Sequence, residues 1–211
     1  MYIPPYHEEQ NLDVLHGLMR AHPLGAWVAL GPAGLTANHL PFVLDATRGP
    51  YGTLRAHVSR ENPVWQARST AVPSIVMFQG PQSYITPSWY PTKPIDGKVV
   101  PTWNYAVVHA HGTPAVIHDR DWLLQAVTDL TNRSEAHRPD PWKVSDAPRE
   151  FIDKLLGAIV GIEIPISEIH GKWKVSQDEA LPDRIATAKA LLQLDDPNAK
   201  ALSGLVSGRI G

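Results

Sequence analysis

The chain of 211 residues contains no cysteine. This excludes a disulfide framework, a thiol nucleophile and a Cys-ligated zinc site. It also lacks any run of roughly 18 apolar residues, the length that a membrane-spanning helix requires. The N-terminal segment MYIPPYHEEQ has neither the basic patch nor the apolar stretch of an export signal. We therefore expect a cytoplasmic protein with no membrane association.

An excess of positive charge is missing as well. The 19 Lys and Arg residues against 21 Asp and Glu residues give a formal net charge of −2. Such a chain has no overall attraction to nucleic acid, and no stretch is dense in Lys and Arg. Ser88 lies in no Gly-x-Ser-x-Gly elbow, and the sequence has neither a Walker-type loop nor a Gly-x-Gly-x-x-Gly motif after a strand. The sequence therefore lacks the motifs that are typical of serine hydrolases, P-loop proteins and Rossmann-fold proteins.

The pattern of apolar residues predicts a mostly β protein with helices, folded as a single domain over residues 1–211. Short alternating runs between Gly25 and about Val116, separated by Gly, Pro and Asp, indicate a sheet that closes on itself. Helical spacing of leucines predicts a first helix over residues 8–22. A late strand over residues 159–166 is followed by a predicted turn at Gly171.

Helices are also predicted in the second half of the chain. Asp119 or Asp121 is a suitable N-cap for one helix, and Asp146, with Pro148 in the first turn, for another. We expect both to pack over the barrel. The chain then becomes helical again over residues 183–194 and 197–206.

Residues 79–112 mix aromatic rings with hydroxyl and amide groups in a region otherwise suited to burial. This mixture fits a large planar ligand with polar edges. The residues that offer rings are Tyr84, Trp89, Tyr90, Trp103 and Tyr105, and those that offer hydrogen bonds are Thr86, Ser88, Thr102 and Asn104. The alternative is an aromatic-rich barrel core with polar turns, which composition alone does not exclude.

Two further groups suit an anion. A predicted strand carries Arg55, His57 and Ser59 at alternate positions, so the three side chains share one face. This face is either a phosphate-binding site or the solvent-exposed face of an antiparallel strand. Lys172 and Lys174 share a face opposite Trp173, and they would either strengthen anion binding or only add solubility.

His109 and His111 also share a strand face, as in some β-barrel metal sites. No third ligand follows at a recognisable interval, so we predict no metal site.

Taken in order along nearly the whole chain, several segments resemble the PaiB-type FMN-binding negative transcriptional regulators. They are MYIPPY, HLPF, LRAHVSRENPVW, FQGPQSYITPSWY, KVVPTWNYAVVHAHG, PWKVSDAP, IVGIEIPI and GKWKVSQ. The resemblance implies the FMN-binding split barrel of pyridoxamine-phosphate-oxidase-like flavoproteins. It also implies a homodimer with flavin mononucleotide (FMN) between the protomers.

The resemblance further implies roles for individual residues. Arg55 and Lys93 would bind the phosphate, Ser88 the phosphate or the ribityl chain, and Trp89, Tyr90, Trp103 and Asn104 would surround the isoalloxazine. The remaining residues of the implied site are His57, Ser59, Thr102, Lys172, Lys174 and Gln177. Where the family motif continues as Ser-Gln-Asn, this chain has Asp178. An anion there is unfavourable beside a phosphate, so Asp178 points away or this end of the motif is no phosphate contact.

The biological role stays open between three hypotheses. The first is a flavin-binding transcriptional regulator, although the sequence shows no helix-turn-helix pattern or basic face, so that a protein partner suits it better than DNA. The second is an FMN-dependent oxidoreductase that uses NAD(P)H, for which no catalytic acid or base stands out. The third is a non-enzymatic flavin or haem binder. Whether the protein is an enzyme remains undecided at this point.

Overall fold

The computed structural model of the chain describes residues 1–69 and 71–209. The strands are β1 (Glu8–Glu9), β2 (Leu24–Gly31), β3 (Gly34–Pro41), β4 (Val43–Asp45), β5 (Thr53–Ser59), β6 (Ser74–Ile85), β7 (Thr102–Gly112), β8 (Ala115–Ile117), β9 (Ile159–Pro165) and β10 (Glu168–Lys174). The helices are α1 (Leu12–Ala21), α2 (Val64–Ala67), α3 (Lys93–Asp96), α4 (Arg120–Glu135), α5 (Arg149–Gly157), α6 (Leu181–Gln193) and α7 (Pro197–Ser207). Short 3₁₀ helices are η1 (Pro5–His7), η2 (Pro87–Trp89) and η3 (Val144–Asp146).

These elements form two compact units. Unit 1 comprises residues 1–18, 79–108 and 170–211, and unit 2 comprises residues 19–78 and 109–169. The strands β6, β7 and β10 each contribute residues to both units. The fold is mostly β with helices, as the sequence predicts.

Unit 2 contains the sheet β4-β5-β9-β8, together with β2 and β3 paired beside the first part of β6. The pairs β4–β5, β5–β9 and β8–β9 are all antiparallel. Alternate residues of these strands face the core, where Trp27, Leu54, Val76 and Ile162 are fully buried. The core rings Phe42 and Phe78 meet edge to face, with centroids 5.9 Å apart.

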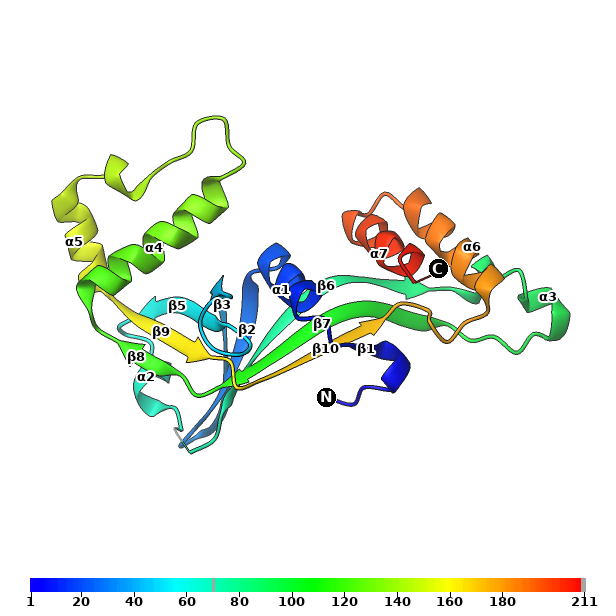
Figure 1. Cartoon of the computed structure of the whole chain (residues 1–211), viewed down its shortest axis with the longest axis horizontal. Helices are drawn as coiled ribbons and strands as arrows, with labels where there is room; N and C mark the ends of the chain where they lie inside the picture. Colours follow the sequence, from blue (N-terminus) through cyan, green and yellow to red (C-terminus); the bar gives the residue numbers. More distant parts are fainter. Residues whose placement is uncertain (70, 210–211) are drawn as a thin grey trace. The chain divides into compact units, whose positions relative to one another are not determined.

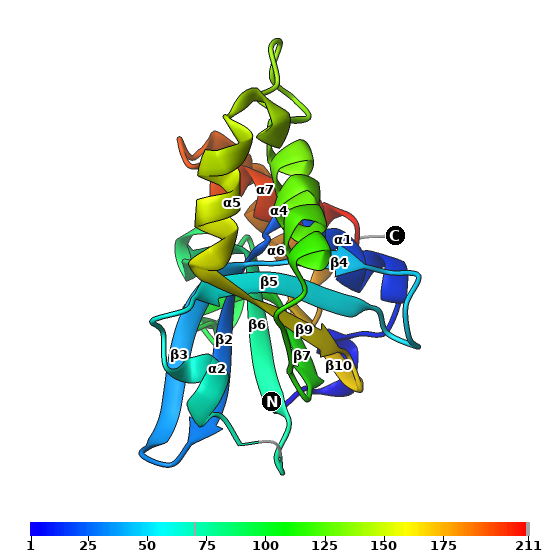
Figure 2. The same cartoon turned by 90° about the vertical axis from the view of Figure 1, so that its left-hand side faces the viewer.

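The helices α4 and α5 lie side by side next to β5 and β9 (Figure 2). Asp119 caps α4 by accepting a 2.8 Å hydrogen bond from the backbone N–H of Trp122, which confirms one of the two predicted caps. Gly161 of β9 permits the close approach of α4, because a Cβ there would lie 2.9 Å from Cε3 of Trp122. A side chain at residue 161 would therefore push α4 off the sheet.

Unit 1 contains the other end of the long strands, in the order β1-β10-β7-β6. Glu8 and Glu9 pair with Lys172 and Gly171 of β10. Gly171 is needed here because a Cβ would collide with Leu15 of α1 and lie 2.8 Å from the carbonyl oxygen of Glu9. The N-terminal segment is thereby held against the edge of this sheet.

The C-terminal helices α6 and α7 form a helical hairpin in unit 1 (Figure 1). The buried hydroxyl of Ser203 donates to the carbonyl oxygen of Ala188, at 2.7 Å, and ties the two helices together. The observed bounds agree with the predicted segments 183–194 and 197–206 to within two residues. No helix in residues 1–69 and 71–209 is both long enough and apolar enough to span a membrane.

Three local predictions are wrong. The first helix begins at Leu12, not at residue 8, because Glu8 and Glu9 join the sheet as β1. Asp146 lies in η3 and accepts from the backbone N–H of Lys143, so the cap position of α5 falls to Pro148. Gly171 lies inside β10 and not in a turn, since its lack of a side chain serves close packing.

Candidate functional site

An aromatic pair lies on the adjoining strands β6 and β7 in unit 1. The ring centroids of Tyr84 and Trp103 are 6.3 Å apart, and the indole N–H of Trp103 donates to the side-chain oxygen of Gln82 at 3.1 Å. Tyr84 is 50% exposed and Trp103 is 49% exposed. These rings are therefore not part of the barrel core, and they offer faces on which a flat molecule can stack.

Two lysines on β10 border the same polar residues of β7. The ammonium group of Lys174 donates to the hydroxyl of Thr102 and, at 3.2 Å, to the carbonyl oxygen of Trp103. Lys172 donates to the carbonyl oxygen of Tyr2 at 3.1 Å and lies 5.4 Å from the ring centroid of Tyr105. Trp173, between them, is buried, so the predicted alternation is confirmed. Within the described residues neither lysine has a carboxylate ion-pair partner, so both charges remain available to an anion.

Asn104, the next residue of β7 after Trp103, is fully buried. Its amide group donates to the hydroxyl of Ser176 at 2.7 Å, while its side-chain oxygen has no partner in the part of the chain that is described. Ser176 has a φ of 65°, in the left-handed region that a side chain rarely adopts. An unpaired buried acceptor beside a strained residue is typical of a binding site and is costly in a purely structural position.

Gln177 has a structural role at the end of β10. Its side-chain oxygen accepts from the backbone N–H of Val175 at 2.7 Å and contacts Nδ1 of His7 at 3.1 Å. Burial is the main influence on His7, and it lowers the pKa of that imidazole. Gln177 therefore fixes the chain next to Lys174 and has little free hydrogen-bonding capacity. Asp178, which replaces the Asn of the family motif, is exposed.

The predicted residues of the Pro87–Lys93 region form a second group in unit 1. Ser88 is exposed, and its backbone N–H donates to the hydroxyl of Thr86 at 3.2 Å. Trp89 is half-buried and Tyr90 is buried, with no partner for its hydroxyl among the residues described. Burial, together with the nearby charges of Glu179, Asp183 and Asp178, raises the pKa of Tyr90 to about 12. Tyr90 is therefore a neutral phenol at any physiological pH.

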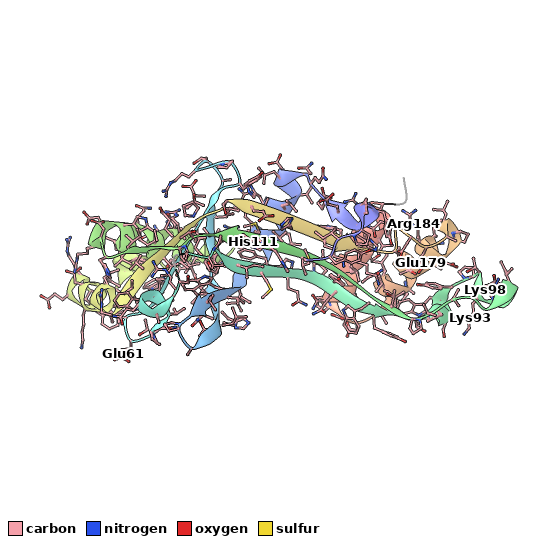
Figure 3. The ribbon with its side chains drawn as sticks, turned by 90° about the horizontal axis from the view of Figure 1, so that it is seen from below. Glu61, Lys93, Lys98, His111, Glu179 and Arg184 are labelled. Carbon is pink, nitrogen blue, oxygen red and sulfur yellow. The ribbon has the colours of Figure 1, made fainter. Side chains whose placement is uncertain are left out.

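Lys93 and Lys98 lie at the α3 end of unit 1, in the connection between β6 and β7 (Figure 3). Lys98 pairs with Asp96 at 3.9 Å, whereas Lys93 is exposed and has no ion-pair partner in the described residues. Lys93 is thus a third uncommitted cation of unit 1.

The remaining predicted residues lie on β5 in unit 2, on alternate positions as expected. Arg55 pairs with Asp129 of α4 at 2.9 Å, although its Nε is buried without a partner. His57 is half-buried, and burial lowers the pKa of its imidazole. The exposed Ser59 accepts from the backbone N–H of Glu61 at 3.2 Å. Arg55 is therefore held by helix α4, a contact that local sequence patterns do not predict.

The structure thus brings one set of predicted residues into direct contact: Thr102, Trp103, Asn104 and Lys174, with Gln177 beside them. The sequence reasoning missed Gln82 and Ser176, which bond directly to Trp103 and Asn104. The alternation of Gln82 with Tyr84 on β6 was a usable signal for the first. No sequence signal marks the positive φ of Ser176.

The donor set of unit 1 suits FMN in its chemistry. The half-exposed pair Tyr84 and Trp103 suits a flat ring system, the unpaired oxygen of Asn104 suits an N–H donor, and Lys172 and Lys174 suit a phosphate. No part of this set demands a different class of ligand.

Comparisons with known proteins agree with this donor set. Residues 1–168 match the family model described as "Putative FMN-binding domain". The Bacillus subtilis "Protease synthase and sporulation protein PAI 2" is 29% identical over all of this chain and 98% of its own length. An uncharacterized protein of Emericella nidulans is 32% identical over 99% of this chain and 97% of its own length.

Solved structures show the same fold at lower identity. The flavocytochrome Anf3 from Azotobacter vinelandii matches with a TM-score of 0.58 and 13% identity, covering 95% of this chain and 78% of that one. The FAD and haem binding protein from Mycobacterium smegmatis matches with a TM-score of 0.57 and 18% identity, covering 80% of this chain and 73% of that one. This chain therefore belongs to the PaiB-type family of FMN-binding split-barrel proteins, and FMN is its cofactor.

Proposed function

We propose that this protein is a flavin-dependent regulator of the PaiB type that binds FMN between two copies of the chain. The observation that carries the proposal is the pair of lysines on β10, whose ammonium groups donate to neutral oxygens and form no ion pair with a carboxylate among the described residues. Two ammonium groups on one strand face can bind an anionic group through charge-assisted hydrogen bonds.

Different side chains of unit 1 bind different parts of FMN. Lys172 and Lys174, with Lys93, bind the phosphate, and the hydroxyl groups of Thr102 and Ser88 bind the phosphate or the ribityl chain. Trp103, Trp89 and Tyr90 enclose the ring system, and Asn104 bonds its polar edge. Gln177 positions Lys174 by closing the end of β10. Arg55, His57 and Ser59 of β5 are separate candidates for a phosphate contact. When bound, FMN supplies one- and two-electron redox chemistry, so its oxidation state is the signal.

Exposed apolar side chains in unit 1 support a shared site. Tyr84 and Trp103 are half-exposed, and Ile95 and Val100 in the connection between β6 and β7 are 79% and 73% exposed. Apolar surface of this kind is covered favourably by a flat ligand and a second protomer. Flavin binding and dimer formation are then thermodynamically linked, because each stabilises the assembly that the other requires.

Charge favours a protein partner over direct binding to the DNA backbone. The chain carries a formal charge of −2, and non-specific DNA affinity depends on neutralising phosphates with Lys and Arg. The cations of unit 1 are assigned to the flavin phosphate in this proposal. A flavin-dependent contact with another regulatory protein requires no basic face.

Substitution of Lys174 tests the flavin part. Lys174→Ala should weaken FMN binding about tenfold or more, because a charge-assisted contact to phosphate is lost. Lys189→Ala is the matched control, since Lys189 is an exposed lysine of α6 in the same unit. Affinity is measured by quenching of flavin fluorescence, and equal affinities in the two variants would remove Lys174 from the site.

The proposed homodimer and the proposed regulatory function are tested with the unsubstituted protein. Sedimentation should show a dimer that FMN strengthens, whereas an FMN-saturated monomer would overturn the shared site. Consumption of NAD(P)H by the FMN-loaded protein would identify an oxidoreductase instead of a regulator. A salt-dependent shift of promoter DNA would replace the protein partner with direct DNA binding.

A further inference from the structure

Two adjoining cavities lie under the helices of unit 2, between α4, α5 and the segment that contains η3. The larger has a volume of about 570 Å³ and the smaller about 300 Å³. Val144 and Ile152 line both, so the two cavities meet at these residues. Each volume is within the range of small-molecule sites, roughly 300–1,000 Å³.

The larger cavity is rich in cations. Arg120 and Arg149 share a single carboxylate, that of Asp153, with Arg149 at 3.9 Å from it. Lys143 also lines this cavity, and its ammonium group has no ion-pair partner in residues 1–69 and 71–209. Asp121 is the other acidic residue of the lining. Positive charge therefore exceeds negative charge at this opening, which attracts an anion.

The smaller cavity is apolar. Its lining is Val127, Thr131, Trp142, Val144, Ile152, Leu155, Leu156, Ala158 and Ile159, with His57 from β5. Among these described lining residues, His57 alone titrates near neutral pH, and burial lowers the pKa of its imidazole toward the uncharged form. A neutral imidazole in apolar surroundings favours a hydrophobic occupant with at most one hydrogen bond.

One helix, α4, contributes residues to both cavities. Thr128 and Asn132 of α4 face the cationic cavity, while Val127 and Thr131 face the apolar one. The helix is fixed by its cap at Asp119 and by Trp122, whose indole N–H donates to Glu163 at 3.3 Å. A rigid helix that borders both cavities can orient a ligand with two chemically different ends.

We propose that these cavities form one binding site for a small amphipathic anion, a carboxylate attached to an aromatic or aliphatic body. The carboxylate binds Lys143, Arg120 and Arg149, and the body enters the apolar cavity past Val144 and Ile152. Of the residues proposed for FMN, the site includes only His57, which lines the apolar cavity and not the cationic one, so it is an effector site additional to the flavin. It does not depend on the proposed regulatory role.

The probe for this site is naphthalenecarboxylate, titrated calorimetrically into the purified full-length protein with FMN saturating. The expected result is saturable binding of one probe per chain. The alcohol analogue, naphthalenemethanol, should bind at least about tenfold more weakly, because it lacks the charge that the cations recognise. Equal affinity of acid and alcohol would overturn the assignment of the cations.

Two variants locate the probe. Lys143→Glu should weaken its binding about tenfold or more, whereas Lys154→Glu, the same charge change at an exposed residue of α5 outside both linings, should change it less than about twofold. Ile152→Trp places a larger side chain where the two cavities meet and should abolish binding. Its control is Leu192→Trp at an exposed position of α6, outside both linings. Equal effects in either matched pair would overturn the proposed location.

Competition with FMN separates this site from the flavin site. Naphthalenecarboxylate should bind equally to flavin-free and flavin-loaded protein. Displacement of the probe by FMN would show that the cavities belong to the flavin site and would overturn an additional one. Absence of saturable binding at millimolar probe concentrations would show that the cavities bind no such anion.

Discussion

Charged side chains are used differently on β5 and β9 of unit 2 and on β10 of unit 1. On β9, Glu163 accepts two hydrogen bonds from the guanidinium of Arg48, at 2.6 and 2.8 Å, and a third from Trp122. On β5, the guanidinium of Arg55 pairs with Asp129. On β10, Lys172 and Lys174 bond only to neutral oxygens within the described part of the chain.

The difference indicates two functions for charge. The pairs of unit 2 join strands to helix α4 and to the loop that carries Arg48, so they stabilise the fold. The lysines of unit 1 keep their charge for an external anion. Substitutions in these ion pairs of unit 2 should therefore reduce stability, and substitutions of these two lysines of unit 1 should reduce ligand affinity.

The largest expected effect is at Glu163, whose side chain is only 12% exposed. Glu163→Gln leaves the guanidinium of Arg48 without its carboxylate and should lower the free energy of unfolding by about 1–3 kcal/mol at neutral pH. Hydrogen bonds from Arg48 are the main reason that the pKa of Glu163 lies below its usual value. This stabilisation should be fully present above the pKa that Glu163 has in the unfolded chain. It should be lost as pH falls through the lower pKa that Glu163 has in the folded chain.

Urea denaturation at neutral and acidic pH measures this effect, with Glu61→Gln at an exposed position as the control. FMN affinity should be unchanged in Glu163→Gln. A large loss of FMN affinity without loss of stability would reverse the division between the two regions.

The next effect concerns Arg55, which the sequence assigns to the phosphate and the structure pairs with Asp129. Arg55→Ala and Asp129→Asn should each lower stability by about 1 kcal/mol, since the pair is partly buried. If Arg55 also binds FMN, only Arg55→Ala will weaken FMN binding, and it will do so more than Arg68→Ala. The control is informative because Arg68 donates to the carbonyl oxygen of Pro114, at 2.9 Å, and so has its own structural role.

Equal FMN affinity in Arg55→Ala and Asp129→Asn would make Arg55 a purely structural residue. In that case phosphate binding falls entirely to the lysines of unit 1. Fluorescence titration of FMN, with stability measured in parallel, separates the two results.

The sequence predicts those features that depend on neighbouring residues. The alternation of Arg55 with His57 and of Lys172 with Lys174, and the cap at Asp119, follow from strand periodicity and helix chemistry. The wrong prediction at Gly171 has a clear cause, because glycine permits either a turn or a close packing contact, and the deciding atoms belong to Leu15 and Glu9.

Contacts between distant segments were beyond such reasoning. The partner of Arg55 is Asp129 on α4, and the partner of Trp103 is Gln82 on another strand. Both contacts depend on strand register and on the packing of a helix, and local patterns in a single sequence do not reveal either. Local motifs therefore select candidate residues for the site, whereas the pairing state of their charges depends on contacts between distant segments.

A smaller effect should appear in the pH dependence of stability. Burial lowers the pKa of His57, so the unfolded chain takes up a proton there more readily than the folded chain. Stability should therefore fall as pH drops below about 6.5, the ordinary histidine value. His57→Phe should reduce this slope in urea denaturation between about pH 7 and pH 5. It should not abolish the slope, because burial also lowers the pKa values of His7 and His22. An unchanged slope would mean that His57 is protonated without cost.

The smallest expected effect is at Tyr90, a residue of unit 1 that the sequence places near the isoalloxazine. Its hydroxyl is buried and has no partner among the residues described. Tyr90→Phe removes an unsatisfied polar group, so the free energy of unfolding should stay constant or rise by up to about 1 kcal/mol. Tyr6→Phe, at an exposed position, is the control for loss of a phenol hydroxyl with the ring retained. If the hydroxyl of Tyr90 bonds to FMN, the variant will instead lose flavin affinity while keeping its stability. That result would extend the pattern of Lys174 to a neutral group, because a side chain left unpaired in the protein alone would again have its partner in the ligand.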